Sequence, residues 1–445
     1  VKANVLVIET SLVGLVLNGL SHLENVGNRS EFAVGLIKGL GGNLNPSTRN
    51  SFAEEILKWS GESSPGKNPT NIFYNKSRDR LESYSNDIEG DLTDLSIDNL
   101  PIVKTADVQM TMDAIMPWLT SKAKQPFLLI GPEGIGKTMI LKHSFSKLRS
   151  TNVATIHCSA NISPQNVIQK LSQVCLTVSS SNGRIYTPKE CDKLILFFKD
   201  LNLAKQDKYG TSMLISFLQQ LITYNGFYDN NNEWIGLQDI QLVGSMTAGS
   251  GLGRHPLSTR LTSIIRIYSI NEPEKEQLEA IYSSYLYTAL KGVAPGHPVW
   301  ANPGKVSSLS SSMVNIYKQF KSTFSVDDNN HYLFTPRDLT RWCLGILRYK
   351  LEGNDKSHNS ILQIWAYECS RLFRDKLVND RDRGKFDSTL SAILQSDWNS
   401  NAASSLQNTF FVTPAASEST GGKMPPHGRR LGQMSSKDWE SYVDK

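Results

Sequence analysis

A glycine-rich loop between an apolar run and a helix-forming stretch restricts this chain to a small set of folds. Residues 126–138 read Pro-Phe-Leu-Leu-Ile-Gly-Pro-Glu-Gly-Ile-Gly-Lys-Thr, which contains the pattern G-x-x-x-x-G-K-[ST] between a strand and a helix. Glycines allow such a loop to turn its backbone N–H groups towards phosphate oxygens. The helix that follows directs the positive end of its dipole to the same place. The pattern therefore predicts a nucleotide-binding phosphate loop.

We expect the whole loop to line the nucleotide site. Lys137 supplies a cation to the outer phosphates, and Thr138 offers its hydroxyl to Mg²⁺. The predicted cofactors are therefore ATP or ADP, together with Mg²⁺. A glycine-rich turn that binds nothing is the alternative, but the flanking strand and helix favour the phosphate loop. The predicted cofactor-binding residues are Gly131, Pro132, Glu133, Gly134, Ile135, Gly136, Lys137 and Thr138.

The composition argues against several classes of function. The 445 residues are 39% hydrophobic and 20% charged, which is ordinary for a globular protein. A net charge of +5 is small for this length, so we expect no nucleic-acid partner. No apolar run reaches the roughly 18 residues of a membrane span. The five cysteines form no C-x-x-C pair, which suits a reducing compartment such as the cytoplasm.

Apolar strands alternate with helical stretches after the loop, and this alternation predicts a parallel sheet flanked by helices. From about Glu274 the strand pattern disappears, and the apolar spacing predicts an all-helical second unit. The candidate strands are 127–130, 153–158, 194–198, 240–245 and 264–268. The candidate helices between them are 138–148, 164–176 and 211–224, and those of the second unit are 274–291, 306–323, 336–351 and 357–379.

The same patterns divide the chain into five segments. Residues 1–60 have the apolar spacing of helices. Residues 61–100 are rich in Ser, Asn, Gly and Asp and predict an irregular connection, with a few strand-like residues near Asn71–Tyr74. Residues 101–272 hold the α/β subdomain with the phosphate loop, and 273–395 hold the helical unit. Residues 396–445 predict a linker. We also expect the chain to be a piece of a longer protein.

An ATPase of this class needs acidic side chains at the end of a second strand beside the phosphate loop. The best candidate strand ends in Lys199-Asp200 and offers one acid where two are expected. Asp200 can polarise a water, but Lys199 places a cation about 6 Å from Mg²⁺, which costs a few kcal/mol at an effective dielectric of about 20. We therefore predict that nucleotide binds and that hydrolysis is slow or absent. A core strand that ends in a charged turn is the alternative.

Four further positions complete the predicted site. Thr247 follows the next strand, where its hydroxyl can touch the γ-phosphate or cap its own turn. Arg254 and Arg260 precede the last strand, from which an arginine can reach a phosphate in a neighbouring subunit. Arg337 begins a helix of the helical unit, where the helix dipole disfavours a cation unless an anion binds. We predict catalytic roles for Asp200, Thr247 and Arg337, and trans-acting roles for Arg260 and Arg254.

The order of these features resembles an AAA+ module, and its details resemble the dynein heavy chain family. Within that family the chain is most similar to the third AAA+ module of the motor ring and to the second cytoplasmic dynein, the motor of retrograde transport in cilia. The resemblance covers residues 100–380 and is less specific outside them. The segments that carry it are 200–203, 207–211, 226–228, 240–244, 253–258, 364–366 and 371–373.

The resemblance implies specific roles for several residues and segments. Lys137 and Thr138 become phosphate and magnesium contacts, Arg337 becomes the second sensor, and Arg260 becomes a finger directed at the preceding module's site. Residues 1–60 become the helical end of the preceding module's lid. Residues 396–445 become the linker towards the next module.

The implied function is that of a regulatory nucleotide-binding module in an ATP-dependent, minus-end-directed microtubule motor. The implied partners are the neighbouring AAA+ modules of the same heavy chain, other dynein subunits and the microtubule, and the implied location is the cytoskeleton and the cilium. Lys199 stands where hydrolysing modules have their first acid, and Thr247 stands where third modules often have Asn. Two alternatives stay open, a structural module with permanently bound nucleotide and an AAA+ chaperone or remodelling ATPase.

Overall fold

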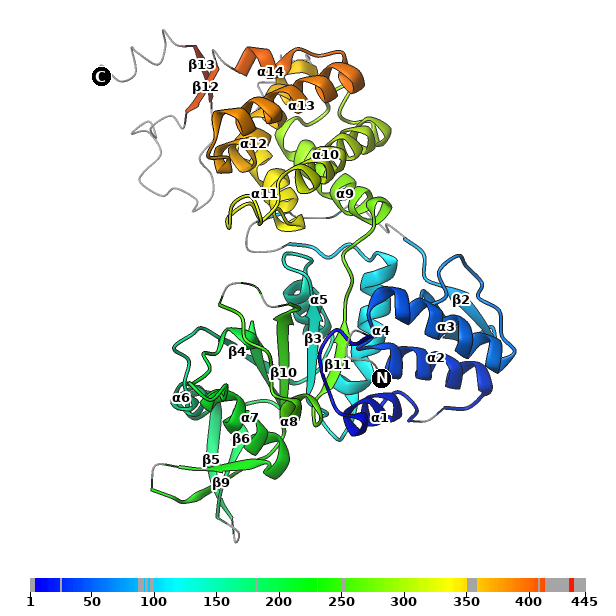
Figure 1. Ribbon diagram of the computed structural model, residues 1–445, viewed down its shortest axis with the longest axis vertical. Helices are drawn as coiled ribbons and strands as arrows, with labels where there is room; N and C mark the ends of the chain where they lie inside the picture. The colour runs from blue at the N-terminus through cyan, green and yellow to red at the C-terminus, as the bar shows by residue number, and fades with distance from the viewer. Residues whose placement is uncertain are drawn as a thin grey trace. The chain divides into compact units, whose positions relative to one another are not determined.

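The computed structural model folds the chain into two compact units (Figure 1). One unit comprises Val1–Ser85 with Ala106–Glu272, and the other comprises Asn86–Thr105 with Pro273–Lys445. The structure describes all residues except 1–4, 25, 87–91, 93, 94, 97–99, 181, 182, 230, 250, 252, 350–357, 407, 408, 413–431 and 436–445.

A five-stranded parallel sheet forms the centre of the first unit. Its strand order is β11-β3-β10-β7-β4, and every neighbouring pair is parallel. The strands are nearly continuous apolar runs, because helices cover both faces of such a sheet. The predicted α/β fold class is confirmed. The strands are β3 (Phe127–Gly131), β4 (Thr151–His157), β7 (Lys193–Lys199), β10 (Ile240–Thr247) and β11 (Arg266–Ser269).

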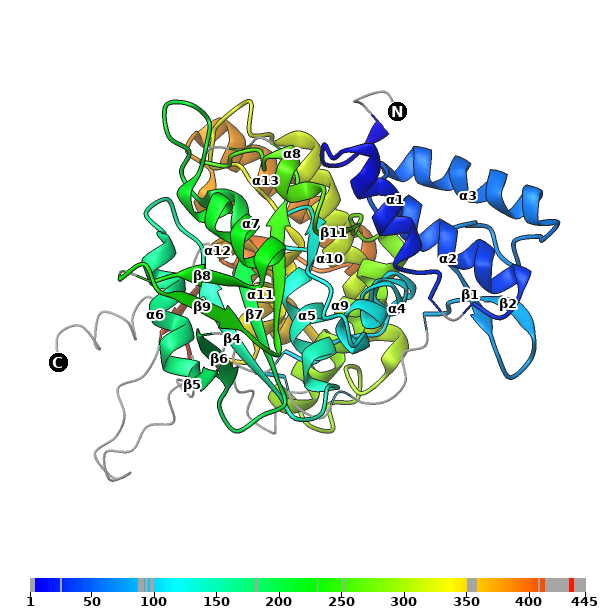
Figure 2. The same ribbon diagram turned by 90° about the horizontal axis from the view of Figure 1, so that it is seen from below.

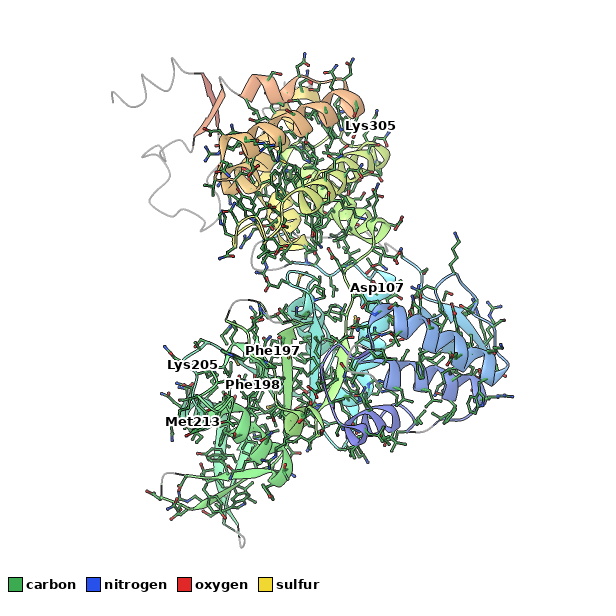
Figure 3. All side chains as sticks on the ribbon, viewed as in Figure 1. Asp107, Phe197, Phe198, Lys205, Met213 and Lys305 are labelled. Atoms are coloured by element: carbon green, nitrogen blue, oxygen red, sulfur yellow. The ribbon has the colours of Figure 1, made fainter. Side chains whose placement is uncertain are left out.

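Helices pack against both faces of this sheet and cover its central strands. They include α5 (Lys137–Ser146), α6 (Pro164–Val174) and α7 (Met213–Tyr224). Phe197 and Phe198, labelled in Figure 3, are neighbours on β7, and the pleat of the strand points them to opposite faces of the sheet. The ring of Phe197 lies 5.8 Å from that of Phe145 on α5, whereas Phe198 joins the apolar cluster that contains Leu214 of α7.

A second, four-stranded sheet was not predicted from the sequence. Its order is β5-β6-β9-β8, and it lies beside α6 and α7 (Figure 2). The β5–β6 hairpin lies within a stretch for which the apolar pattern predicts only the end of a helix, because its strands are short and half exposed. The strands are β5 (Cys175–Ser180), β6 (Gly183–Pro188), β8 (Gly226–Tyr228) and β9 (Trp234–Leu237).

Three N-terminal helices dock on the edge of the large sheet. They are α1 (Leu12–Leu20), α2 (Arg29–Gly41) and α3 (Pro46–Ser60), and they lie beside β11 and α4 (Ala106–Thr120) (Figure 1). The buried Asn18 amide donates to the main-chain oxygen of Ile267 at 3.0 Å, and its oxygen accepts from the Ile267 N–H at 2.9 Å. The buried Arg49 donates to the main-chain oxygen of Ser269 at 3.0 Å. Side chains therefore bind the open edge of β11 as a further strand would.

The connection between these helices and the sheet contains a hairpin. It is formed by β1 (Ile72–Asn75) and β2 (Arg80–Ser83), which pair antiparallel. Tyr84 follows the hairpin and its hydroxyl contacts Asp113 of α4, while Lys38 of α2 donates to the same hydroxyl at 3.0 Å. The strand-like residues expected near Asn71–Tyr74 thus lie largely in β1, whereas β2 was not predicted. Further along this connection, residues 87–91, 93, 94 and 97–99 lie outside the described part of the chain.

The second unit is a helical bundle with an aromatic core, which confirms the predicted helical lid. The indole rings of Trp342 and Trp365 lie 4.6 Å apart, and Trp342 donates to the main-chain oxygen of Trp365 at 2.9 Å. Both side chains are fully buried. The helices are α9 (Lys275–Val293), α10 (Pro303–Thr323), α11 (Pro336–Ile346), α12 (His358–Leu372) and α13 (Asp380–Trp398).

The segment predicted as a linker, 396–445, holds more structure than expected. Helix α13 continues to Trp398 because Phe386, Leu390 and Leu394 form one buried stripe. A short helix α14 (Ala402–Ser405) follows, and β12 (Thr409–Val412) pairs antiparallel with β13 (Gly432–Ser435). Residues 413–431 and 436–445 of the predicted linker lie outside the described residues.

All five cysteines have free thiols, and four of them are buried. Within the part of the chain that the structure describes, no helix combines the length and the apolar character needed to cross a bilayer.

Candidate functional site

The carboxyl ends of β3, β10 and β7 bring the phosphate loop, Thr247 and Asp200 to one edge of the sheet. In the register of the sheet Thr247 lies opposite Gly131, and Ser245 lies opposite Lys199. The phosphate loop follows β3, Thr247 ends β10, and Asp200 directly follows β7. Ligands bind at this edge in open α/β sheets. The parallel strands thus bring motifs that are far apart in the sequence close together in space.

The phosphate loop has the backbone that its glycines permit. Gly134 and Gly136 have φ values of +72° and +92°, in the left-handed region that costs glycine little. At Gly131 a Cβ atom would lie 2.7 Å from Cδ1 of Ile135 and 2.8 Å from the main-chain oxygen of Ile270. Larger residues at these positions would therefore distort the loop, either through its torsion angles or through contact with neighbouring backbone.

Lys137 is a buried cation at the start of α5. The residue is 8% exposed, and its Nζ donates to the main-chain oxygens of Gly131 at 2.8 Å and Pro132 at 2.6 Å. A buried ammonium needs an anion or several acceptors, because burial removes its hydration. A polyphosphate at the start of α5 supplies such an anion, so the residues present fit a bound nucleotide.

Asp200 adopts a backbone conformation that is uncommon for any residue except glycine. Its φ and ψ are +56° and +52°, and it precedes the short 3-10 helix η2 (Leu201–Leu203). Residues held in the left-handed region cost of order 1–3 kcal/mol and are frequent at functional sites. The turn ends β7 abruptly and leaves the carboxylate half-buried at the edge where the phosphate loop lies.

The neighbours of Asp200 are a half-buried lysine and a buried thiol. The main-chain oxygen of Lys199 accepts from the Cys158 N–H at 2.9 Å. Burial raises the pKa of the Cys158 thiol to about 12, and the Asp200 charge adds to this effect. The thiol therefore stays protonated at neutral pH, which argues against a nucleophilic role for it.

Thr247 is buried at the end of β10 and is linked to β7 through an asparagine. The Asn202 amide donates to the main-chain oxygen of Thr247 at 3.0 Å, and Asn202 itself is 1% exposed. The oxygen of the Asn202 backbone accepts from the His255 N–H at 2.8 Å. No role for Asn202 was predicted from the sequence, because a polar residue three positions after the end of β7 has many possible partners.

Arg254 turns towards the phosphate loop of its own unit. Its guanidinium forms an ion pair with Glu133, and it donates to Oδ1 of Asn202 at 3.4 Å. The Arg254 side chain is 15% exposed and that of Glu133 is 33% exposed. This geometry differs from the predicted trans-acting role, in which the side chain would extend away from its own loop. The two residues are 121 positions apart in the sequence. No sequence pattern predicted that they pair.

Arg260 has the exposure that a trans-acting residue requires. It lies on the short helix α8 (Thr259–Thr262) and is exposed. Its trans-acting role stays a prediction.

Arg337 belongs to the helical unit. It is the exposed second residue of α11, which begins with a capping box between Thr335 and Asp338. The helix therefore begins at Pro336, as the sequence predicts. The role of Arg337 as second sensor stays a prediction.

The described residues offer few ligands for a divalent cation. Among the described residues, no cluster of three or more His, Cys, Asp and Glu side chains has the arrangement of a metal site. Mg²⁺ usually keeps several waters and binds through one or two protein ligands together with substrate phosphates. The Thr138 hydroxyl and the Asp200 carboxylate are the groups of this site that suit such a cation.

Comparisons with known protein families match most of the chain to dynein. Residues 96–273 match the family described as the P-loop containing dynein motor region, and residues 285–383 match the dynein heavy chain ATPase lid domain. Residues 1–60 match the AAA+ ATPase domain of cytoplasmic dynein 2 heavy chain 1. The α/β unit and the helical unit are therefore similar to two parts of the same family.

Individual relatives agree with the family matches. Cytoplasmic dynein 2 heavy chain 1 of Homo sapiens is 46% identical over all of this chain, and that of Tripneustes gratilla is 46% identical over 99% of it. The protein of the same name from Chlamydomonas reinhardtii is 37% identical over 87% of the chain. The chain spans about a tenth of the length of these relatives, 11%, 10% and 9% respectively.

These matches remove the alternative of a chaperone or remodelling ATPase from another AAA+ family. A parallel sheet with a phosphate loop, a helical lid, and identity along the whole length of the chain all lead to one assignment. The chain belongs to the dynein heavy chain family, and it comprises an AAA+ module with its lid.

Proposed function

We propose that this chain is the third AAA+ module of a cytoplasmic dynein 2 heavy chain, and that it binds ATP or ADP to regulate the motor. The observation that supports nucleotide binding most directly is the buried Lys137 ammonium, which lies at the start of α5 beside Gly131 and Pro132. The left-handed glycines around it leave backbone N–H groups to face a polyphosphate.

Each residue of the pocket has its own role in binding the nucleotide. Lys137 neutralises the outer phosphates, and Thr138 holds Mg²⁺ through its hydroxyl. Asp200 orients water from the end of β7, and Thr247 contacts the outer phosphate or that water from the end of β10. Arg337 acts as the second sensor from the helical lid. A bound nucleotide supplies the charge that these groups recognise.

Slow or absent hydrolysis follows from the charges at the end of β7. Lys199 precedes Asp200 at the position where a second acid would support the metal. A cation about 6 Å from Mg²⁺ costs a few kcal/mol at an effective dielectric of about 20. The long Lys199 side chain can reduce this cost by turning towards solvent. The pocket thus favours retention of nucleotide over its cleavage.

The docking of the N-terminal helices supports a role in coupling. Asn18 and Arg49 bind β11, and β11 pairs with β3, which leads into the phosphate loop. A nucleotide that changes the position of β3 would therefore act on α1–α3 as well. Because these helices are proposed to end the preceding module's lid, the nucleotide state of this pocket would bias its neighbours in the ring.

The proposed cellular role is based on the similarity of this chain to its relatives. The proteins named cytoplasmic dynein 2 heavy chain 1 share at least 34% identity with this chain over 85% or more of it. We place the chain in a minus-end-directed, ATP-dependent motor of retrograde transport in cilia, on the microtubule cytoskeleton of the cytoplasm. Its partners are then the neighbouring AAA+ modules, other dynein subunits and the microtubule.

A single-turnover measurement on the whole motor domain tests this proposal. A preparation whose other phosphate loops are inactivated should bind labelled ATP, and Lys137→Ala should abolish that binding. Arg149→Gln removes a positive charge from an exposed position and serves as the control that should leave binding intact. Equal nucleotide binding with and without Lys137 would refute the proposal.

A permanently bound structural nucleotide is the second candidate, and Lys199 is the feature that favours it. In that case the labelled nucleotide would remain uncleaved and unexchanged over many cycles of the motor. Slow, Lys137-dependent release of product or exchange of nucleotide would favour the regulatory module instead.

A further inference from the structure

We propose that Glu133 and Arg254 form a charge pair within one module that sets the preference of its phosphate loop for a nucleoside triphosphate over a diphosphate. The inference rests on the proposed function, since it requires that the loop binds nucleotide. It assigns Arg254 to its own pocket rather than to that of a neighbouring module.

Arg254 is fixed between the phosphate loop and the ends of two strands. Its guanidinium pairs with the Glu133 carboxylate on one side and donates to Oδ1 of Asn202 at 3.4 Å on the other. Asn202 is almost fully buried, and its amide donates to the main-chain oxygen of Thr247 at 3.0 Å. One chain of contacts therefore joins the phosphate loop to the ends of β7 and β10. A planar guanidinium suits this position because it presents several donors in fixed directions.

The pair lies at the end of the loop that faces the outer phosphates. In this motif the lysine reaches the β- and γ-phosphates, and Nζ of Lys137 already lies 2.6 Å from the main-chain oxygen of Pro132. Glu133 follows Pro132 directly. The third phosphate of a bound nucleotide would thus come close to the Glu133 carboxylate and to its partner Arg254.

The two charges act on a triphosphate in opposite directions. A carboxylate near the γ-phosphate repels it, and the repulsion is strong in a partly buried site, where the effective dielectric is low. Arg254 neutralises this carboxylate and offers charge-assisted hydrogen bonds to the phosphate itself. A diphosphate lacks the γ-phosphate, which would lie near both charges. Changes to the pair therefore alter the affinity of the pocket for a diphosphate less.

Removing either partner should therefore shift the nucleotide preference in a defined direction. Arg254→Gln exposes the Glu133 charge and should weaken triphosphate binding about tenfold relative to diphosphate, or about 1.4 kcal/mol. Glu133→Gln leaves Arg254 available to the phosphate and should strengthen triphosphate binding relative to diphosphate. The double variant removes both charges, and its preference should return to within about threefold of the original.

The experiment uses the whole motor domain and two fluorescent nucleotides, ADP and an ATP analogue with a non-hydrolysable β–γ bond. The binding that Lys137→Ala removes is assigned to this pocket, and the ratio of the two dissociation constants is measured for that component. Arg149→Gln is the control for loss of one positive charge, because Arg149 is exposed and lies beyond the C-terminal end of α5. Thermal unfolding of each variant checks that the module is folded.

Three outcomes are distinguishable. Opposite shifts in the single variants and recovery in the double variant support the charge pair. Unchanged ratios in Arg254→Gln, together with faster loss of nucleotide from the preceding module's pocket, would overturn it in favour of a trans-acting arginine. Absence of any Lys137-dependent binding would instead remove the proposed function on which the inference rests. If Arg254→Gln fails to fold, Arg254→Lys keeps the charge but loses the planar fork, and an unchanged ratio with Glu133→Gln still contradicts the proposal.

Discussion

At the scale of single residues, two lysines at the edge of the sheet have opposite consequences for a bound nucleotide. Lys137 is buried and held by main-chain oxygens of the phosphate loop, so an incoming polyphosphate meets a positive charge already in position. Lys199 ends β7, directly before Asp200, and adds a positive charge where metal-assisted cleavage requires a negative one. Binding and hydrolysis are therefore separable in this pocket, because they depend on different residues.

Changing Lys199 to Asp should raise the rate of phosphate release from this pocket. The substitution restores an anion on the metal side, and removing a cost of a few kcal/mol corresponds to about tenfold or more in rate. Single-turnover release of labelled phosphate from the whole motor domain measures the effect. Lys199→Met separates loss of the cation from gain of the anion, and it should give a smaller increase. Unchanged release and unchanged Mg²⁺ affinity in both variants would remove the electrostatic explanation.

At the scale of elements, α1–α3 dock on the edge of β11. This contact attaches the three N-terminal helices to the nucleotide-binding sheet. Asn18 supplies both a donor and an acceptor to Ile267, and Arg49 donates to Ser269. An edge strand exposes unpaired backbone groups, and these side chains satisfy them. The interface is polar and directional, so single substitutions should loosen it without unfolding the sheet.

Replacing Asn18 with Leu should loosen α1 and α2 from the sheet. The change leaves the buried N–H and C=O of Ile267 without their partner and costs about 2–4 kcal/mol. Hydrogen exchange of residues in α1, α2 and β11 in the motor domain measures the loss of protection. Asn152→Leu alters an exposed asparagine of β4 and should change protection by less than about 0.5 kcal/mol. Equal effects of the two variants would argue against an anchoring role for Asn18.

A neighbouring contact, between His22 after α1 and the main-chain oxygen of Ala114 on α4 at 2.9 Å, should weaken in acid. Burial lowers the pKa of His22 from 6.5 to about 4, although main-chain oxygens of Ala114 and Asn18 oppose the shift. The unfolded chain therefore binds more protons between these two pH values. The stability contributed by neutral His22, at most about 3 kcal/mol, is fully present above pH 6.5 and is lost as the pH falls towards 4.

Hydrogen exchange of α1 and α2 between pH 4.5 and 7, corrected for intrinsic exchange rates, measures this dependence. His22→Asn cannot titrate in this range and should flatten the slope. His331→Asn changes an exposed histidine of the helical unit and should leave it unchanged. A slope that persists in His22→Asn would show that another group is responsible.

At the scale of the whole molecule, the chain comprises one AAA+ module with its lid. It spans about a tenth of the length of relatives such as cytoplasmic dynein 2 heavy chain 1 of Homo sapiens. Under the proposed function, the pocket acts on the motor through the neighbouring modules. Arg260 is the exposed side chain proposed to reach the preceding module, and Arg254 is instead engaged with Glu133 of its own loop. The two arginines, six positions apart, are thus assigned to different pockets.

Changing Arg260 to Ala should accelerate loss of nucleotide from the preceding module's pocket and leave the Lys137-dependent binding in this module unaltered. The reason is that a trans-acting guanidinium stabilises phosphate charge across the interface between modules. Nucleotide release from the two pockets in the whole motor domain, separated by inactivating one phosphate loop at a time, measures the effect. A loss of affinity in this module alone would contradict the assignment.

Much of the architecture can be predicted from local patterns, and the failures share one cause. The strands that surround Lys137 and Asp200 are long apolar runs, so their pattern is visible without the fold. Strand β5, with Leu176 and Val178 half exposed, and helix α13, with one narrow stripe of three buried residues, carry weak patterns. Such elements become stable only through the neighbours that cover them, which sequence spacing does not report.

The phosphate loop on a parallel sheet and the helical lid that follows it can be predicted from local sequence patterns, because these features depend on residues close together along the chain. The pairing of Glu133 with Arg254, the contact of Asn202 with Thr247 and the binding of Asn18 to the edge of β11 appear only in the folded chain. Each of these contacts joins residues that are distant in sequence. Their formation depends on strand order and register, which are settled by the packing of the whole unit and not by any local pattern.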